Sequence, residues 1–175
     1  MSVTKDNFKR AMGAFPSGVT VITTRLADGT DVGMTASAFS SLSMEPPLGL
    51  VCIQNRLDMY RFIEAAGGFA VNILAADQET LSNRFAGGYV DDAGQWQSWP
   101  EDKDKFADLT ISRGAHTGSA LIHGARASID CRLHAVYPGG DHGIFVGHFE
   151  QIILSDQDET ESLLYAGGRY RRFAE

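Results

Sequence analysis

The sequence has little of what marks secreted, disulfide-stabilised or membrane-spanning proteins. Only two cysteines, Cys52 and Cys131, occur in 175 residues, and their separation matches neither a zinc-binding spacing nor a disulfide framework. We therefore expect both thiols to be reduced and buried in strands, as in a cytoplasmic protein. No apolar run approaches the ~20 residues that span a bilayer, and the first residues lack the apolar core of a signal peptide.

Positive charge is also scarce. Fifteen Lys and Arg residues stand against 22 Asp and Glu residues, so the formal net charge is −7. Nucleic acids and anionic membranes attract basic surfaces, and we therefore expect neither as a partner. The hydrophobic share of 43% and the charged share of 21% are typical of a globular protein. The length favours a single domain that spans residues 1–175.

Several common catalytic motifs are missing from the sequence. No Gly-x-Gly-x-x-Gly follows a strand-like run, so a doubly wound dinucleotide-binding fold is not supported. The sequence also lacks a phosphate loop and the Gly-x-Ser-x-Gly of a serine nucleophile elbow. Its five histidines form no cluster at a metal-ligand spacing, and we expect no metal site.

The chain does contain many short β-branched and apolar runs joined by tight turns. The expected strands cover residues 18–26, 31–39, 48–54, 69–74, 120–137 and 143–155, and the expected helices cover 5–14, 56–66 and 77–85. Because residues 48–54 are apolar almost throughout, we expect that strand to be buried on both faces. Residues 87–118 are the least regular part, and a loop of this length usually builds or covers a site. The pattern indicates a mainly β protein, an antiparallel barrel with peripheral helices.

The stretch at residues 33–47 begins as the end of a strand and then loses the alternation of apolar and polar residues that is typical of a strand. It is rich in serine and threonine and stops at Pro46-Pro47. Small residues let the backbone approach a bound group, and hydroxyls both donate and accept hydrogen bonds. The stretch could therefore hold a phosphate or a polar ring edge, although an ordinary serine-rich loop has the same composition.

A second candidate site lies in the turn at residues 138–142. It places the imidazole of His142 at the rim of a sheet, beside Asp141, whose carboxylate could orient the ring. A histidine in a loop is also commonly no more than an exposed side chain.

Further candidates lie at a helix end and near the C-terminus. Arg84, followed by Phe85 and Ala86, offers a guanidinium suited to a phosphate, or a solvated arginine on an amphipathic helix. Tyr170 and Arg172 could stack on or pair with a ligand, or belong to a frayed tail.

Taken together and in order, these segments resemble the flavin reductase family that uses an FMN-binding split barrel. The similarity runs from about Phe8 to Tyr170. The segments that carry it are residues 33–39, 41–47, 51–54, 69–74, 84–86, 140–147 and 164–170. The resemblance implies a Greek-key-like barrel that forms a homodimer, with one flavin near each subunit boundary. The chain departs from the family pattern at Asn55-Arg56-Leu57-Asp58, where relatives often have a basic residue followed by serines.

The resemblance also implies roles for individual residues. The expected flavin-binding residues, which act through backbone groups, hydroxyls and the lining of the ring, are Thr35, Ala36, Ser37, Ser41, Ser43, Cys52, Ile53 and Gln54. Arg84, with Phe85 and Ala86, is expected near the flavin phosphate. Tyr170 is expected to approach the same pocket. His142, steered by Asp141, is expected where the nicotinamide stacks over the flavin.

The implied activity is that of an NAD(P)H:flavin oxidoreductase. Hydride passes from the reduced nicotinamide to FMN or FAD, and the reduced flavin leaves for a partner monooxygenase. Two alternatives share the fold: a reductase that holds its flavin tightly and passes electrons to another acceptor, such as a corrin cobalt centre, and a flavin- or haem-binding module without turnover. The sequence leaves open the choices between NADH and NADPH and between FMN and FAD.

Overall fold

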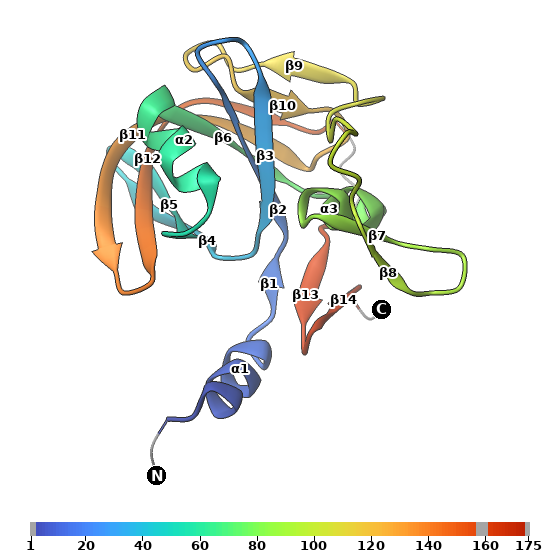
Figure 1. Ribbon diagram of the computed structural model, residues 1–175. Coiled ribbons are helices and arrows are strands. Elements are labelled where there is room, and N and C mark those ends of the chain that lie inside the picture. Colours follow the sequence, from blue (N-terminus) through green and yellow to red (C-terminus); the bar gives the residue numbers. More distant parts are fainter. Residues whose placement is uncertain (1–2, 157–160, 174–175) are drawn as a thin grey trace.

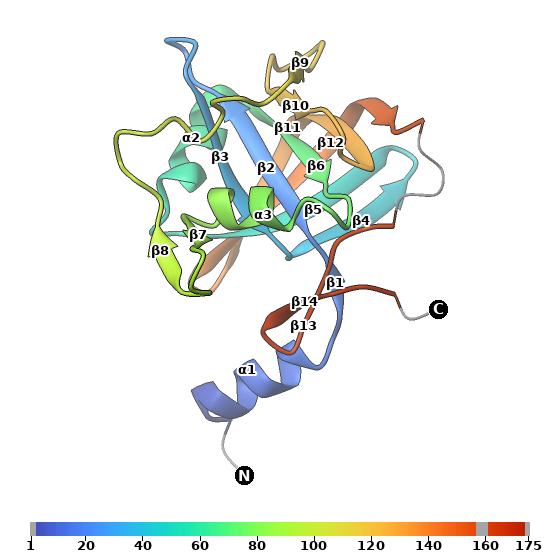
Figure 2. The same ribbon diagram turned by 90° about the vertical axis from the view of Figure 1, so that its right-hand side faces the viewer.

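A computed structural model describes residues 3–156 and 161–173, and shows a mainly β architecture with three short helices (Figures 1 and 2). The helices are α1 (Lys5–Gly13), α2 (Asp58–Ala66) and α3 (Glu79–Phe85). The strands are β1 (Ser17–Gly18), β2 (Thr20–Arg25), β3 (Asp31–Ala36), β4 (Phe39–Met44), β5 (Pro47–Gln54), β6 (Gly68–Ile73), β7 (Gly88–Val90), β8 (Trp96–Ser98), β9 (Ile111–Arg113), β10 (Ala120–Ile122), β11 (Ala127–Gly139), β12 (His142–Leu154), β13 (Leu164–Ala166) and β14 (Arg169–Arg171). None of the helices in this described part is long and apolar enough to cross a membrane.

Seven strands form one antiparallel sheet in the order β3-β2-β6-β11-β12-β5-β4. The sheet curls, but its edge strands β3 and β4 are not hydrogen-bonded to each other, so the barrel stays split. The chain passes directly from one edge strand to the other through Ser37 and Ala38. The family resemblance predicted this split antiparallel barrel, and the prediction is confirmed.

The sheet has an apolar core on each of its faces. Inside the curl, Ile22, Ile53 and Phe145 pack with Met59 and Ile63 from α2, so this helix fills the mouth of the barrel. Adjacent residues of a strand point to opposite faces. Those of β2 therefore serve both cores, and a second cluster on the outer face comprises Val19, Val21, Leu74, Phe85, Ile122 and Leu163.

Helix α1 stands apart from this body (Figures 1 and 2). It starts where expected because Thr4 caps it, with its side-chain oxygen accepting a hydrogen bond from the Asn7 amide at 3.2 Å. None of its residues is buried. Its end is joined to the C-terminal hairpin, where the Gly167 amide donates to the Gly13 carbonyl at 2.7 Å.

The serine-rich stretch at residues 33–47 is more regular than expected. The expected strand 31–39 ends at Ala36, and after a bend at Ser37 the chain forms β4, a second strand paired with β5. A register shift in this pair lies between Ser41 and Ser43, which explains the lost alternation. Backbone pairing therefore imposed strand geometry where the side chains alone did not indicate it.

Several other boundaries also differ from those expected. Strand 18–26 splits into β1 and β2, and the expected strand 120–137 splits into β10 and β11 around residues 123–126. Helices α2 and α3 each begin two residues later than expected, at Asp58 and Glu79. The irregular segment 87–118 contains three short strands, β7, β8 and β9. Of the expected domain 1–175, residues 1–2, 157–160 and 174–175 lie outside the described residues.

Burial along β5 also corrects an expectation. Side chains alternate from buried Val51 and Ile53 to half-buried Cys52 and Gln54, so only one face of the strand is deeply covered. Cys52 is consequently half-buried instead of buried, whereas Cys131 is buried as expected. Both cysteines are free thiols. Burial raises the pKa of the Cys131 thiol, which keeps it protonated and unreactive.

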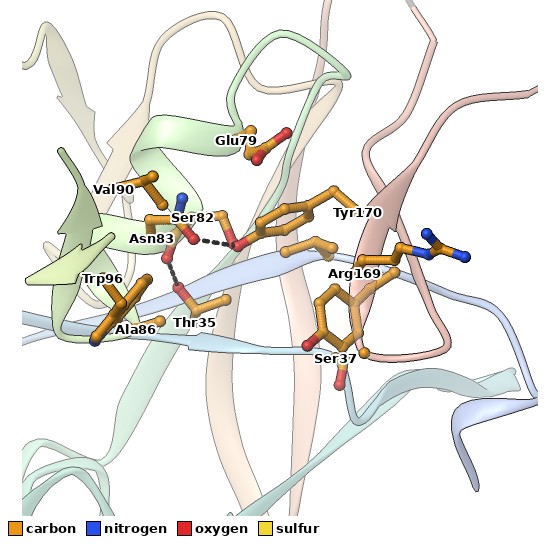
Figure 3. A pocket seen from close by; sticks show the side chains of 13 residues that line it. Thr35, Ser37, Glu79, Ser82, Asn83, Ala86, Val90, Trp96, Arg169 and Tyr170 are labelled. Carbon is orange, nitrogen blue, oxygen red and sulfur yellow. Dashed lines mark hydrogen bonds between the residues drawn. The ribbon is translucent and has the colours of Figure 1, made fainter. Parts of the chain in front are cut away.

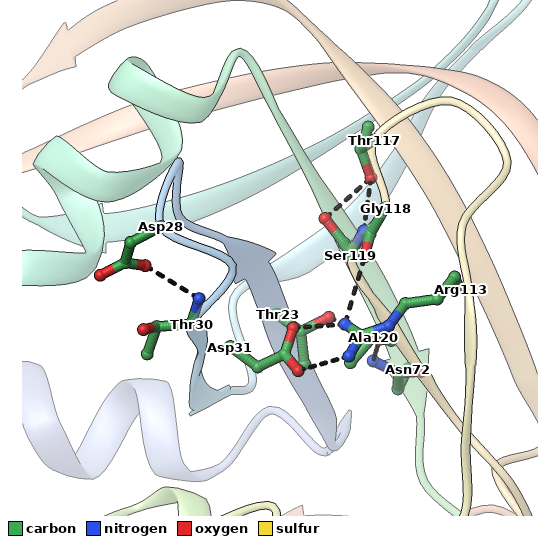
Figure 4. A network of polar contacts seen from close by, with 10 residues as sticks. All are labelled: Thr23, Asp28, Thr30, Asp31, Asn72, Arg113, Thr117, Gly118, Ser119 and Ala120. Carbon is green, nitrogen blue, oxygen red and sulfur yellow. Dashed lines mark hydrogen bonds and ion pairs between the residues drawn. The ribbon is translucent and has the colours of Figure 1, made fainter.

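A buried amide links four strands at the centre of the molecule; Figure 4 shows this side chain, Asn72, beside Ala120. Asn72 on β6 donates from its Nδ2 to the carbonyl of Val21 at 3.1 Å and of Ala120 at 3.3 Å. Its Oδ1 accepts from the Ile122 amide and the Ser128 hydroxyl, both at 2.8 Å. The side chain is fully buried and uses all of its hydrogen-bonding groups, so it ties β2, β10 and β11 to β6.

Candidate functional site

A pocket of about 570 Å³ opens beside the bend between β3 and β4 (Figure 3). The end of β3, one side of α3, the β7–β8 hairpin and the β13–β14 hairpin surround it. Its lining residues are Val19, Thr35, Ser37, Glu79, Ser82, Asn83, Ala86, Val90, Trp96, Tyr165, Gly168, Arg169 and Tyr170. Hydroxyl, amide and aromatic groups therefore line one cavity, and we call it the hydroxyl pocket.

Hydrogen bonds from α3 hold the two sides of the hydroxyl pocket together. The Thr35 hydroxyl donates to the Ser82 carbonyl at 2.6 Å. The phenol oxygen of Tyr170 lies 2.8 Å from both Asn83 Oδ1 and Ser82 Oγ. Since a phenol has a single proton, it donates to the amide oxygen and accepts from the serine hydroxyl. Burial raises the pKa of Tyr170, so this phenol is neutral over the physiological range.

A second group of candidate residues lies on the neighbouring hairpin turn. Strand β12 begins at His142, which pairs directly with Gln54 at the end of β5. His142 Nδ1 is 2.7 Å from Asp141 Oδ1, as the sequence predicted. This hydrogen bond lowers the pKa of the Asp141 carboxyl. The turn is held to β5 by Asn55, whose amide donates to the Asp141 carbonyl at 3.0 Å.

The backbone joins these two groups at one end of the sheet. The Cys52 amide donates to the Ala38 carbonyl at 3.0 Å, next to Ser37 of the hydroxyl pocket. Two residues further along β5, about 7 Å away, Gln54 pairs with His142. Ser37 and His142, which are far apart in the sequence, therefore lie at the same end of the sheet.

Only some of the predicted flavin-binding residues line the hydroxyl pocket. Thr35, Ser37, Ala86 and Tyr170 do so. Cys52 and Gln54 lie on the half-buried face of β5, at the same end of the sheet as the pocket. Ser41 and Ser43 lie further along β4, where Ser43 pairs with Leu48 at the opposite end of β5.

Three predicted residues have side chains in the core. Ala36 and Ile53 belong to the cluster inside the barrel, and Phe85 belongs to the outer one. Phe85 packs edge-on against Phe106, with ring centroids 5.0 Å apart. Residue Gly33 has no side chain because a Cβ there would lie 2.8 Å from the Phe85 ring. Any contact of Ala36, Ile53 or Phe85 with a ligand would therefore have to come from the backbone.

The two arginines of the prediction lie outside the hydroxyl pocket. The guanidinium carbon of Arg84 lies 4.9 Å from the centre of the Trp99 ring, and its Nη1 donates to the Ala107 carbonyl at 3.0 Å. Arg84 thus anchors the long segment 87–118 to α3. Arg172 is exposed, whereas Arg169 lines the pocket in its place.

Several lining residues were missed in the sequence. Glu79, Ser82 and Asn83, together with the predicted Ala86, follow one face of α3 at helical spacing. The spacing of the apolar residues Leu81 and Phe85 on the opposite face predicts this helix, and the sequence gives no signal that the polar face lines a pocket. Trp96 lies in the irregular segment 87–118, for which the sequence predicts only that it builds or covers a site, and it lines the pocket. Glycine at position 88 lets the tryptophan ring pack against β7, because a Cβ there would lie 2.4 Å from the ring.

Comparison with known proteins identifies close relatives over nearly the whole chain. The family model described as a flavin reductase like domain matches residues 12–174. An NADH-dependent FAD reductase of Streptomyces globisporus is 39% identical over 95% of this chain and 84% of its own. The reductase component of a 4-hydroxyphenylacetate 3-monooxygenase of Thermus thermophilus is also 39% identical, over 96% of both chains.

Solved structures agree with these sequence relatives. The NADH:FAD oxidoreductase of Streptomyces globisporus superposes with a TM-score of 0.85 at 36% identity, over 100% of this chain and 98% of that one. The same oxidoreductase in complex with NAD and FAD fragments gives a TM-score of 0.83 at 35% identity, over 97% and 93%. This chain belongs to the flavin reductase family.

Proposed function

We propose that this protein is an NAD(P)H:flavin oxidoreductase that supplies reduced flavin to a partner monooxygenase. The observation that carries the proposal is the strand pairing of Gln54 with His142, which sets the histidine turn at the same end of the sheet as the hydroxyl pocket. The relatives named above support it, because one is an NADH-dependent FAD reductase and another a monooxygenase reductase component.

The hydroxyl pocket and the neighbouring end of β5 suit a flavin. The ring system of a flavin has an apolar face and a polar edge that accepts and donates hydrogen bonds. The pocket offers the aromatic faces of Trp96 and Tyr165 together with the hydroxyls of Thr35 and Ser37. Arg169 supplies a positive charge at its rim, suited to a phosphate.

In this proposal each group of residues has a separate task. A flavin, when bound, takes up the hydride that the reduced nicotinamide gives. Thr35, Ser37 and the backbone from Ala36 to Ala38 orient its polar edge. The half-buried side chains of Cys52 and Gln54 line the surface next to the hydroxyl pocket, at the same end of the sheet. His142, held by Asp141, positions the nicotinamide.

Either FMN or FAD, and either NADH or NADPH, fits this proposal. The solved relative with NAD and FAD fragments favours NADH and FAD as the first ligands to test. We place the protein in the cytoplasm, because its two cysteines are free thiols.

We further propose that the protein is a homodimer. Helix α1 carries an exposed apolar stripe of Phe8 and Met12, continued by Phe15, which are 55%, 56% and 76% exposed. Such a stripe on a projecting helix favours contact with another protein surface. A second copy of the chain would cover it, in line with the dimer that the family resemblance implies.

The test of the function is an absorbance spectrum of the purified protein followed by anaerobic addition of NADH. Colourless protein that oxidises NADH only with added FMN or FAD supports a diffusing flavin substrate and a monooxygenase partner. Yellow protein that bleaches at once indicates a tightly bound flavin, and the acceptor then has to be sought elsewhere, for example in a corrin cobalt centre. Absence of turnover with saturating flavin and oxygen would contradict the proposal and favour a non-catalytic carrier.

A further inference from the structure

A second hollow lies beside the histidine turn. Its volume is about 620 Å³, and it is lined by Lys5, Lys9, Gln54, Asn55, Arg56 and Asp141. Three separate parts of the chain contribute: the first two turns of α1, the turn between β5 and α2, and the tip of the β11–β12 hairpin. We call it the cationic pocket.

The cationic pocket gathers three positive charges in a protein whose net charge is −7. Within the described residues, neither Lys5 nor Lys9 takes part in an ion pair. They are four residues apart on α1 and so lie on one face of the helix. Like charges placed together repel one another, so an anion between them would relieve an unfavourable arrangement.

The guanidinium of Arg56 is oriented in advance. Its Nε donates to Gln54 Oε1 at 2.8 Å, which uses one N–H and leaves the four N–H groups of the two terminal nitrogens for a ligand. Asn55 fixes the same turn, because its Nδ2 donates to the Gly140 carbonyl at 3.2 Å. A guanidinium held in this way loses little side-chain entropy when it binds a phosphate.

The chemistry of the remaining lining narrows the ligand class. The Asp141 carboxylate can accept hydrogen bonds from sugar hydroxyls, and its pKa is lowered by the hydrogen bond with His142, so it is charged at neutral pH. The cations of the pocket match a phosphate, and the neighbouring carboxylate and amides match the hydroxyls of a ribose joined to it. The other end of this turn is His142, where the proposed function places the nicotinamide.

We propose that the cationic pocket binds the phosphate groups of the nicotinamide nucleotide, through Lys5, Lys9 and Arg56. This inference rests on the proposed function, which supplies the nicotinamide beside His142. The flavin would occupy the hydroxyl pocket, and the nucleotide would extend from the histidine turn toward α1. A flavin phosphate has the same chemistry, so the experiment has to separate the two sources.

The test is calorimetric titration of NAD⁺, which does not react, into protein saturated with riboflavin, which has no phosphate. The variants are Lys5→Gln/Lys9→Gln and Arg56→Gln. We expect each to weaken NAD⁺ binding roughly tenfold, because a charge-assisted hydrogen bond is lost. The affinity for nicotinamide riboside, which lacks phosphate, should stay within about twofold, since only the phosphate contact is removed. Added salt should weaken NAD⁺ binding to the wild type more than to the variants.

The matched control is Arg10→Gln. Arg10 carries the same charge on the same helix and does not line the pocket, so NAD⁺ binding should not change. A Lys9→Arg variant keeps the charge and should bind NAD⁺ as the wild type does. Circular dichroism would verify that α1 is retained in each variant.

Two results would overturn the inference. In one, the variants bind NAD⁺ as tightly as the wild type. In the other, they lose affinity for FMN but not for riboflavin, which assigns the pocket to the flavin phosphate. Oxidation of NADH by the wild type with added flavin, measured in parallel, separates these results from a failure of the proposed function. If the wild type turns over and the variants bind NAD⁺ as tightly as it does, only the role of the cationic pocket is contradicted. If the wild type does not turn over, the proposed function itself is contradicted.

Discussion

The position of His142 depends on the pairing of two strands that are distant in the sequence. Its ring is held by Asp141 through Nδ1, and its backbone by Gln54 of another strand. A side chain fixed at two points can orient a substrate at little entropic cost. The proposed task is positioning, which predicts a specific kinetic pattern.

We expect His142→Ala to lower kcat/KM for NADH roughly 10- to 100-fold, because a misplaced nicotinamide rarely reaches a reactive geometry. Flavin affinity should remain unchanged, since the hydroxyl pocket is not altered. Stopped-flow mixing of NADH with flavin-loaded protein measures the effect. His134→Ala is the control, as it removes an exposed histidine from the same hairpin. An unaltered hydride-transfer rate together with unaltered NADH affinity would remove this role from His142.

Tyr170 ties the C-terminal hairpin to α3 through Ser82 and Asn83. We expect Tyr170→Phe to lower the free energy of unfolding by about 1 kcal/mol, because a part-buried hydrogen bond is lost. The wild-type pKa of Tyr170 is raised by burial, so its protonated form is favoured in the folded state. The contribution of the Tyr170 phenol to the free energy of unfolding is therefore complete below about pH 10, the pKa of a tyrosine in the unfolded chain. It falls as the pH rises further.

Urea denaturation of both proteins at neutral pH and at about pH 11 checks this expectation. The stability difference between wild type and Tyr170→Phe should shrink at the higher pH. A difference that grew with pH would show that the phenol is not buried as described.

At the scale of elements, α1 has two functions assigned to two faces. With 100° between successive residues, Phe8 and Met12 lie close together, Lys5 and Lys9 lie to one side, and Arg10 lies on the far side. The apolar stripe is proposed for the dimer contact and the lysines for the nucleotide. Since no residue of α1 is buried, its substitutions act on binding more than on the fold.

We expect Phe8→Glu/Met12→Glu to shift the protein from dimer to monomer, because two charges would replace the apolar contact. The thermal unfolding of the monomer should resemble that of an Arg10→Glu control, which alters the far side of α1. Analytical ultracentrifugation measures the oligomeric state. A wild-type protein that sediments as a monomer would contradict the proposed dimer without affecting the fold.

At the scale of the whole molecule, the two cores share one sheet, and Asn72 ties strands of this sheet to β10. This amide bonds to β2, β10 and β11 from its position on β6. Segments from four parts of the sequence are therefore stabilised together. Buried polar groups left without partners cost more than the hydrogen bond itself contributes.

We expect Asn72→Ala to lower the free energy of unfolding by about 3 kcal/mol or more, since several buried groups lose their partner at once. Urea denaturation followed by circular dichroism measures the change. Asn7→Ala, at an exposed position of α1, should change stability by less than about 0.5 kcal/mol. A loss for Asn72→Ala no larger than that of the control would show that water or a rearrangement satisfies the freed groups.

Local signals in the sequence were sufficient for much of the fold. Thr4 caps the start of α1, close to the expected boundary, and Gly67, with a φ of 70°, ends α2 as a glycine cap. The ordered motifs identified the family, and the Asp141–His142 contact followed from adjacency in a tight turn. Strand β4 was missed, because its serine-rich pattern carries little strand propensity and its geometry comes from pairing with β5.

For the candidate site, too, the sequence determined some features and the tertiary structure decided others. The sequence by itself determined which residue types could meet a flavin and a nicotinamide, since hydroxyls, a histidine turn and a C-terminal tyrosine are chemical facts of the chain. Only the tertiary structure decided that Ile53 and Phe85 face the cores, that Arg84 anchors a loop, and that Arg169 lines the pocket. The physical reason is that side-chain direction depends on register and packing between distant segments, which local composition does not encode.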